Sequence, residues 1–136
     1  MITGGCLCGR VRYTAGANPI TTRVCWCRDC QYFAAGGGTV NVVFPREAVT
    51  LSGPLRDYDS AADSGNPMRR QFCAHCGTPV TSGSDVRPHL IILRAGTLDD
   101  PEIAKPSMTI WTESAPTWAC IDPETPQTPR QPPPAG

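Results

Sequence analysis

Short runs in which apolar and polar residues alternate are the main pattern along this chain. In the segment 9–15, for example, Val11 and Tyr13 alternate with polar residues, which is typical of a strand that buries one face. No helical period of apolar residues continues beyond two turns. The pattern therefore predicts strands at residues 9–15, 38–44, 55–59, 68–72, 79–82 and 89–95.

Turn signals separate these runs. They are rich in glycine and proline, as in Gly36-Gly37-Gly38 and Ser52-Gly53-Pro54, and such residues favour tight turns. One helical turn is predicted at Pro45–Ala48, with Pro45 at its first position. The sequence therefore indicates a mainly β fold of short strands with little helix.

Length and composition divide the chain into two parts. At 136 residues it holds one domain, which we place at residues 1–122. Residues 123–136 contain six prolines and no large apolar side chain, so this segment favours extended or polyproline conformations and has nothing to bury. We expect it to be a tail that is either disordered or ordered by a partner chain.

The charge balance excludes some function classes. The formal net charge is zero, whereas a general nucleic-acid binder needs an excess of basic residues. No apolar run approaches the roughly 18 residues of a membrane span, and no secretory leader is recognisable at the start. We therefore expect a cytoplasmic protein without nucleic-acid or membrane partners, as a monomer or a homodimer.

Seven of the eight cysteines fall into three tight groups, C-L-C-G at 6–9, C-W-C-R-D-C at 25–30 and C-A-H-C-G at 73–77. In a reducing compartment such groups usually bind metal or perform redox chemistry. The first and third groups supply two pairs of thiols, Cys6 with Cys8 and Cys73 with Cys76, and each pair is followed by a glycine. Four thiols suit a closed, tetrahedral, structural zinc site, and the glycines allow the backbone to turn at positive φ.

The middle group differs, because Cys25, Cys27 and Cys30 offer only three sulfurs to one metal. A three-thiolate zinc has an open position at which chemistry can occur. Arg23 and Arg28 could offset its negative charge. The alternatives are that Cys120 completes a second structural site, or that the thiols stay metal-free and sense redox state. Cys120 lies alone between apolar residues and is expected to be a buried hydrophobic side chain.

Four motifs in register resemble the glutathione-dependent formaldehyde-activating enzyme family, which also includes centromere protein V. They are G-G-C-L-C-G-R-V-R-Y at 4–13, C-x-C-x-x-C-Q at 25–31, S-G-N-P-M-R-R-Q-F-C-A-H-C-G-T-P at 64–79 and I-W-T-E-S-A-P-T-W at 110–118. The resemblance implies a β-tent fold of short antiparallel sheets with two zinc ions per chain. Cys6, Cys8, Cys73 and Cys76 would hold the structural ion, and Cys25, Cys27 and Cys30 the labile, catalytic one.

The activity implied by this resemblance is a carbon–sulfur lyase reaction, in which S-(hydroxymethyl)glutathione interconverts with glutathione and formaldehyde. The partners would then be a small thiol and an aldehyde. The alternatives are a non-catalytic, zinc-stapled interaction module and a thiol redox sensor. The family commonly has histidine where this chain has Trp26. Trp26 could form an apolar wall beside the open position or pack under its loop, and Trp26 and Arg28 are the candidate substrate contacts.

Overall fold

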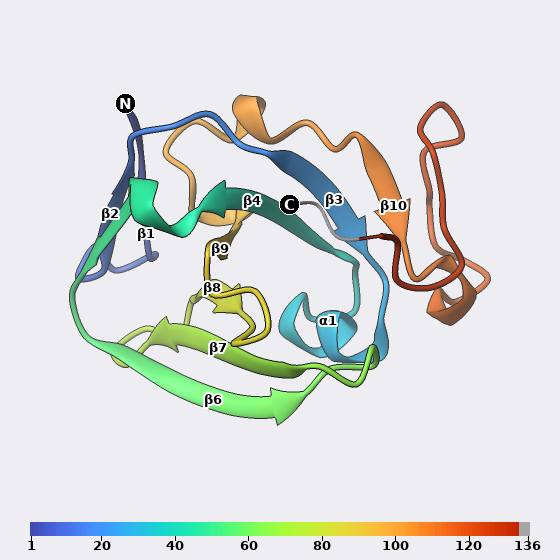
Figure 1. Ribbon diagram of the computed structural model, residues 1–136, viewed down its shortest axis with the longest axis horizontal. Coiled ribbons are helices and arrows are strands. Elements are labelled where there is room, and N and C mark those ends of the chain that lie inside the picture. The colour runs from blue at the N-terminus through green and yellow to red at the C-terminus, as the bar shows by residue number, and fades with distance from the viewer. Residues whose placement is uncertain (134–136) are drawn as a thin grey trace.

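The computed structural model of the protein describes residues 1–133 and is mostly β, in two sheets of short strands (Figure 1). The prediction of a mainly β fold with little helix is therefore confirmed. The strands are β1 (Ile2–Gly5), β2 (Arg12–Ala15), β3 (Thr21–Cys25), β4 (Thr39–Pro45), β5 (Val49–Ser52), β6 (Leu55–Ala61), β7 (Pro67–Cys73), β8 (Pro79–Gly83), β9 (Leu90–Arg94) and β10 (Met108–Ile110).

The larger sheet has seven strands in the order β10-β3-β4-β9-β8-β7-β6, and the smaller has three in the order β1-β2-β5. Neighbouring strands are antiparallel, except that β10 runs parallel to β3. In Figure 1 the larger sheet curves, so that β3 and β4 lie across the molecule from β6 and β7. The short helix α1 (Arg28–Phe33) lies between these two parts of the sheet.

One face of the larger sheet forms the main hydrophobic core. Alternate residues of β4 and β9, such as Val42, Phe44 and Leu93, are completely buried against the smaller sheet. That sheet contributes Val11, just before β2, and Tyr13, within it, whose hydroxyl lies 2.8 Å from the hydroxyl of Thr97. The alternation that predicted a strand at residues 9–15 therefore arises because one face of β2 is buried.

The opposite face of the larger sheet is not packed against the smaller one. In an antiparallel pair, directly opposed residues lie on the same face, and Arg23 of β3 opposes Asn41 of β4, which in turn opposes Arg94 of β9. Cys25 lies two positions after Arg23 and so shares this face. Polar, cationic and thiol side chains therefore gather on the concave side of the sheet.

Several elements differ from the sequence prediction. Strand β3 was not predicted because the side chains on its concave face, Arg23 among them, are not apolar. Helix α1 was not predicted because six residues are too few to establish a helical period. The predicted turn at Pro45–Ala48 is a 3-10 turn over Arg46–Ala48, and Pro45 precedes it as the capping residue.

Residues 126–131 of the expected tail lie beside β10. The Thr109 amide donates to the Pro126 carbonyl at 3.0 Å, and the Thr128 amide donates to the Thr109 carbonyl at 3.0 Å. The last three residues of that tail, 134–136, lie outside the described residues. Within residues 1–133 there is no helix that is long and apolar enough to cross a membrane.

Candidate metal centres

The first cluster, here called the four-cysteine cluster, consists of Cys6, Cys8, Cys73 and Cys76. Their four sulfur atoms lie within 4.8 Å of one another. The sulfur of Cys8 is 3.5 Å from that of Cys6 and 3.8 Å from that of Cys73. Four thiolates around a tetrahedral zinc, with bonds of about 2.3 Å, have sulfur–sulfur separations of about 3.8 Å. The cluster therefore fits a zinc ion.

The backbone around the four-cysteine cluster turns as the glycines predict. Gly9 and Gly77 have φ values of 81° and 77°, a region that side chains rarely adopt. These turns direct amide groups at the sulfurs, since Val11 N–H donates to Cys6 Sγ at 3.2 Å and Cys76 N–H donates to Cys73 Sγ at 3.4 Å. Such hydrogen bonds stabilise thiolates and fix the ligands' orientation.

The second cluster, here called the cysteine triad, consists of Cys25, Cys27 and Cys30. Cys25 ends β3, Cys27 caps α1, and Cys30 is in the first turn of that helix. The Cys30 amide donates to Cys27 Sγ at 3.4 Å, so the cap of the helix is itself a thiol. All three residues are buried, and their sulfurs lie within 4.8 Å of one another. The triad therefore also fits a metal ion, with three protein ligands.

Electrostatics concentrates negative charge within the triad. Hydrogen bonds from Cys25 and Cys27, with smaller contributions from the Thr39 hydroxyl and the charge of Arg94, lower the pKa of the Cys30 thiol to about 2 against the effect of burial. The same hydrogen bonds, seen from the other partner, raise the pKa of Cys25. A metal ligand must be deprotonated, and Cys30 is the sulfur that is most readily in that state.

Buried Gln31 holds the loop that carries the triad. Its side-chain amide donates to the carbonyl of Trp26 at 2.8 Å and to the carbonyl of Ser114 at 3.0 Å. These two bonds connect the loop before α1 with the turn that follows β10. Gln31 belongs to the C-x-C-x-x-C-Q motif, but the sequence did not identify its role, because the motif does not show which carbonyls lie nearby.

A cavity of ≈ 150 Å³ opens beside the triad. All three cysteines line it, together with Trp111, which follows β10. Trp111 has φ 59° and ψ 37°, a left-handed conformation that is strained for a side chain of this size. Its indole N–H donates to the Gln131 side chain at 3.0 Å, and Gln131 also lines the cavity.

Arginines dominate the charge of the cavity. Arg23, Arg70, Arg87 and Arg94 line it, against the single acidic residue Asp63. Arg70 contacts Asp29 at 3.6 Å and donates to Ser60 at 2.7 Å, and Arg94 donates to Asn41. The sequence singled out Arg23 but not Arg94. The available signal was a charged residue ending the apolar run L-I-I-L-R.

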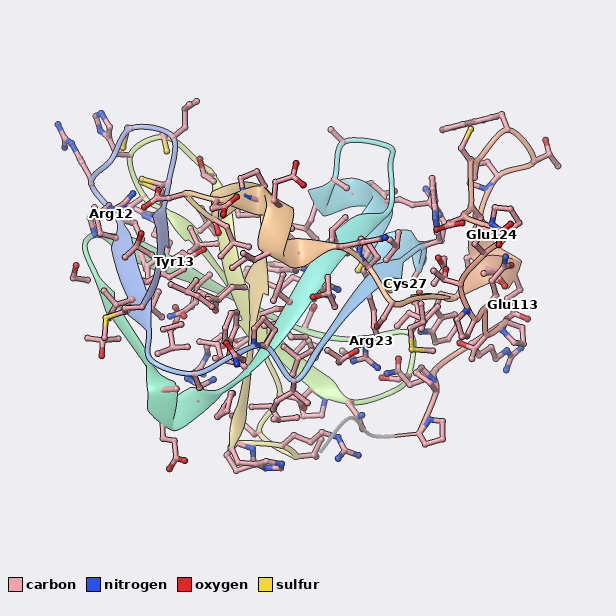
Figure 2. All side chains as sticks on the ribbon, turned by 90° about the horizontal axis from the view of Figure 1, so that it is seen from above. Arg12, Tyr13, Arg23, Cys27, Glu113 and Glu124 are labelled. Carbon is pink, nitrogen blue, oxygen red and sulfur yellow. The ribbon has the colours of Figure 1, made fainter. Side chains whose placement is uncertain are left out.

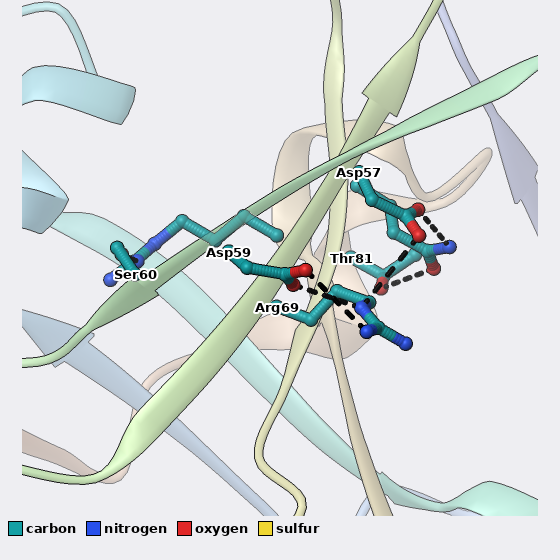
Figure 3. A network of polar contacts seen from close by, with 7 residues as sticks. Asp57, Asp59, Ser60, Arg69 and Thr81 are labelled. Carbon is teal, nitrogen blue, oxygen red and sulfur yellow. Dashed lines mark hydrogen bonds and ion pairs between the residues drawn. The ribbon is translucent and has the colours of Figure 1, made fainter.

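Neighbouring Arg69 lies on the other face of β7 from Arg70. It donates to Asp59 at 2.9 Å and lies 3.7 Å from Asp57. Figure 3 shows Ser60, the partner of Arg70, on the opposite side of the β6–β7 pair from Asp59 and Arg69. Arg70 therefore lines the cavity and Arg69 does not.

The two candidate substrate contacts lie outside the cavity lining. Trp26 is buried, and a Cβ atom on Gly38 would lie only 3.0 Å from its ring, so the ring packs against β4's leading edge. Arg28 is exposed, with its guanidinium 5.2 Å from the centre of the Tyr32 ring. Of the residues that the sequence named near the triad, Arg23 lines the cavity, whereas Trp26 and Arg28 do not.

Cys120 corrects one expectation from the sequence. It is exposed rather than buried, because the segment after Trp118 runs along the surface beyond the turn. It is also absent from both groups of sulfurs that could hold a metal within the described chain. The fourth position of the triad is therefore not closed by Cys120.

The fold has a counterpart among solved structures. A crystal structure of a Rhodobacter sphaeroides protein aligns with a TM-score of 0.55 and 16% identity, over 93% of this chain and 99% of that one. At this identity the likeness concerns the fold alone. No curated protein matches the chain at the level required for a significant match.

The family assignment rests on a match over most of the chain. The family model described as glutathione-dependent formaldehyde-activating enzyme matches residues 1–114. This range contains all seven cysteines of the four-cysteine cluster and the triad. The chain belongs to the glutathione-dependent formaldehyde-activating enzyme family.

Proposed function

We propose that the protein is a zinc-dependent carbon–sulfur lyase-type enzyme that acts on adducts of a thiol and a small aldehyde such as formaldehyde. The observation that carries this proposal is the opening of the cysteine triad onto a cavity. A closed four-thiolate site has no position for a substrate, whereas a three-thiolate site beside a cavity has one. Membership of a formaldehyde-activating family supports the choice of electrophile.

The proposed reaction joins a thiol R–SH to formaldehyde and gives R–S–CH₂–OH. A sulfur–carbon bond forms, the π electrons of the carbonyl move to its oxygen, and the thiol proton ends on that oxygen. The reverse reaction breaks the same bond and returns the thiol and the aldehyde. No oxidant or reductant is needed in either direction.

The residues of the triad would hold one zinc ion, and the four-cysteine cluster would hold a second, structural ion. When bound at the triad, zinc supplies a Lewis acid that lowers the pKa of a thiol at its open position. Gln31 orients the loop that carries the ligands. Trp111 and the surrounding sheet exclude bulk water from one side of the cavity.

Proton transfer is assigned to solvent. Asp29 and Tyr32 are the side chains closest in sequence to the triad that could serve as a base, and neither lines the cavity. Asp29 is instead paired with Arg70, and Tyr32 is 75% exposed. We propose that water in the open cavity accepts the thiol proton and returns it to the hydroxymethyl oxygen. The reducing cytoplasm is the compartment that suits this free thiol chemistry.

The non-catalytic interaction module and the redox sensor are less well supported. A module is favoured by a second closed site, and Cys120 does not close the triad. A redox sensor is favoured by thiols that hold no metal, whereas the three triad sulfurs lie within 4.8 Å of one another and fit a metal ion.

Metal analysis combined with an exchange assay tests the proposal. Protein purified without chelator is expected to contain two zinc ions per chain and to accelerate the exchange between ¹³C-formaldehyde and its thiol adduct, followed by NMR. Cys27→Ser is expected to lose one zinc and this acceleration while keeping its circular dichroism spectrum.

The exposed Cys120→Ser variant is the matched control and should retain both zinc ions and the activity. Wild-type protein that holds two zinc ions but does not accelerate the exchange with any thiol would overturn the proposed enzymatic activity. One zinc in both the wild type and Cys27→Ser would remove the metal from the proposed mechanism.

A further inference from the structure

A half-buried cation in the cavity has no partner. The guanidinium of Arg23 makes no hydrogen bond or ion pair with another residue of the described range 1–133, and its Nε atom is fully buried. Figure 2 shows Arg23 and Cys27 close to one another, far from Arg12 and Tyr13 at the other end of the molecule. Arg23 therefore lies unpaired beside the cysteine triad.

This arrangement is costly unless an anion enters the cavity. Taking a charged group out of water without a hydrogen-bonded partner is unfavourable, and burial lowers the pKa of Arg23 against the opposing effect of the charge of Cys25. Nearby Asn41 accepts a hydrogen bond from Arg94 and none from Arg23. An anionic ligand would supply the missing partner.

Two of the other arginines in the cavity, Arg94 and Arg70, already interact with negative groups. Three thiolates around a divalent ion carry one net negative charge, and Arg94 interacts favourably with the charges of Cys30 and Cys25. Arg70 is paired with Asp29. The sulfur of a hydroxymethyl adduct is uncharged, so a second group of the ligand has to supply the anion for Arg23.

The spacing limits how far this second group lies from the sulfur. Arg23 and Cys25 are alternate residues of β3 on the same face of the sheet, so their Cα atoms are about 7 Å apart. Both line the same cavity. An anionic group that is two or three carbons from a thiol could contact Arg23 while the sulfur lies at the triad.

The size of the cavity points in the same direction. Its volume of ≈ 150 Å³ is about half the low end, roughly 300 Å³, of pockets that enclose drug-sized ligands. A tripeptide thiol would have to leave most of its body outside. A thiol of three or four carbons would be enclosed.

We propose that the thiol substrate is a small mercaptocarboxylate, whose carboxylate binds Arg23 while its sulfur lies at the cysteine triad. The planar guanidinium can donate two parallel hydrogen bonds to a carboxylate. This assignment rests on the proposed function, since it names the substrate class of the same site. It makes Arg23 a residue that determines specificity.

Binding of unreactive thioethers tests the carboxylate site without relying on catalysis. Calorimetry would compare 3-(methylthio)propionate with its neutral amide, 3-(methylthio)propanamide, on the zinc-containing protein. The carboxylate is expected to bind at least about tenfold more tightly, as charge-assisted bidentate hydrogen bonds predict. Arg23→Gln should abolish this preference, and Arg23→Lys should restore part of it. Arg69→Gln, which changes an arginine outside the cavity, is the matched control and should keep it.

Turnover measurements separate failure of this inference from failure of the proposed function. In the exchange assay the kcat/KM for 3-mercaptopropionate should exceed the values for its amide and for glutathione by about tenfold, and Arg23→Gln should bring the first two together. Equal rates for all three thiols, unchanged in Arg23→Gln, would overturn the assignment of a mercaptocarboxylate substrate and leave the proposed enzymatic activity unaffected. Arg23-dependent binding of the thioether without any turnover would support the carboxylate site and overturn the enzyme. Thioether binding without carboxylate preference would overturn the site.

Discussion

The four-cysteine cluster joins segments that are 65 positions apart, whereas the cysteine triad lies within six residues of one strand, loop and helix. The first cluster connects the loop after β1, in the smaller sheet, with the end of β7, in the larger. The triad connects nothing distant, and it faces a cavity that the four-cysteine cluster does not line. Cysteine sulfurs therefore bring distant segments together in one place and face a cavity in the other.

The four-cysteine cluster is more exposed to solvent than the triad, although its proposed role is the structural one. Cys8 is exposed and Cys76 partly exposed in the four-cysteine cluster, whereas every member of the triad is buried. A closed site needs no protection from water, because all four positions are taken by protein. An open site needs a surrounding wall that selects what reaches the fourth position.

The largest expected effect comes from breaking the four-cysteine cluster. Cys73→Ser should prevent stable folding, since a structural zinc contributes on the order of 10 kcal/mol, comparable to the whole stability of a domain. The zinc content, the circular dichroism spectrum and the unfolding midpoint would be measured beside Cys120→Ser. If Cys73→Ser stays folded with an unchanged midpoint, closure of the fold is not the role of this cluster.

A smaller effect is expected from the residue that supports the triad. Gln31→Leu leaves the carbonyls of Trp26 and Ser114 without their buried donor, which should cost about 1–3 kcal/mol in the free energy of unfolding. It should also reduce zinc at the triad but not at the four-cysteine cluster. Denaturant unfolding and zinc stoichiometry measure the two effects.

The control for this change is Gln71→Leu, whose side chain contacts Asp57 and Thr81 on the outer part of the sheet. It is expected to destabilise less than Gln31→Leu and to keep both zinc ions. Equal loss of zinc from both clusters in Gln31→Leu would mean that the glutamine supports the whole fold rather than the triad.

Truncation after Asp122 tests whether the C-terminal segment supports the cavity wall at Trp111 without affecting the two clusters. Residues 1–122 are predicted to fold and to keep both clusters, because every cluster cysteine lies within them. Loss of Gln131 removes the hydrogen bond to Trp111, worth about 1 kcal/mol, so tryptophan fluorescence should shift to the red. Gln131→Ala in the full chain should reproduce most of the shift, and an unchanged spectrum in both would contradict the role of Gln131.

The smallest expected effect is a pH dependence near the four-cysteine cluster. Hydrogen bonds from Arg12 and then Thr3 hold the pKa of Asp99 below its ordinary value of 3.8. A carboxyl with a lowered pKa contributes stability above its unfolded pKa and loses it as the pH falls through the folded one. The contribution should therefore be full at neutral pH and disappear below about pH 4.

The unfolding midpoint of Asp99→Asn should therefore lie below that of the wild type at neutral pH. The two midpoints should converge as the pH falls below 4. Asp85→Asn, at an exposed carboxyl that is not engaged by Arg12, is the control and should show no such convergence. A difference that stays constant from pH 7 to pH 3 would contradict the assignment.

Strands β2, β4, β8 and β9 could be predicted, and each of them contributes buried residues to the main core. Val11 and Tyr13 alternate with polar residues because β2 buries one side, and the run that forms β9 is apolar because both its faces are covered. Strands β3 and β10 escaped prediction, since the concave face of the sheet carries Arg23 and Cys25 where a core would place apolar side chains. A functional surface removes the periodicity by which a strand is recognised.

The cysteine groups could be found because each group is local in sequence. Arg23 could also be suggested, because it lies two residues before Cys25. Arg94 could not, because it reaches the same face only through a strand order, β3-β4-β9, that the sequence does not reveal. Trp26 shows that membership of a motif does not by itself place a side chain in the cavity. Its neighbours Cys25 and Cys27 line the cavity, but Trp26 does not, and its ring packs beside Gly38.

The segment of residues 126–131, which lies beside β10, affects how the cavity can change in shape. It lies outside the range 1–114 that the family pattern matches, yet it holds Trp111 and contributes Gln131 to the cavity wall. Substitutions in it can reshape the chamber without touching any cysteine or strand. The cavity wall can therefore be altered through a segment that contains none of the cysteines of the two clusters.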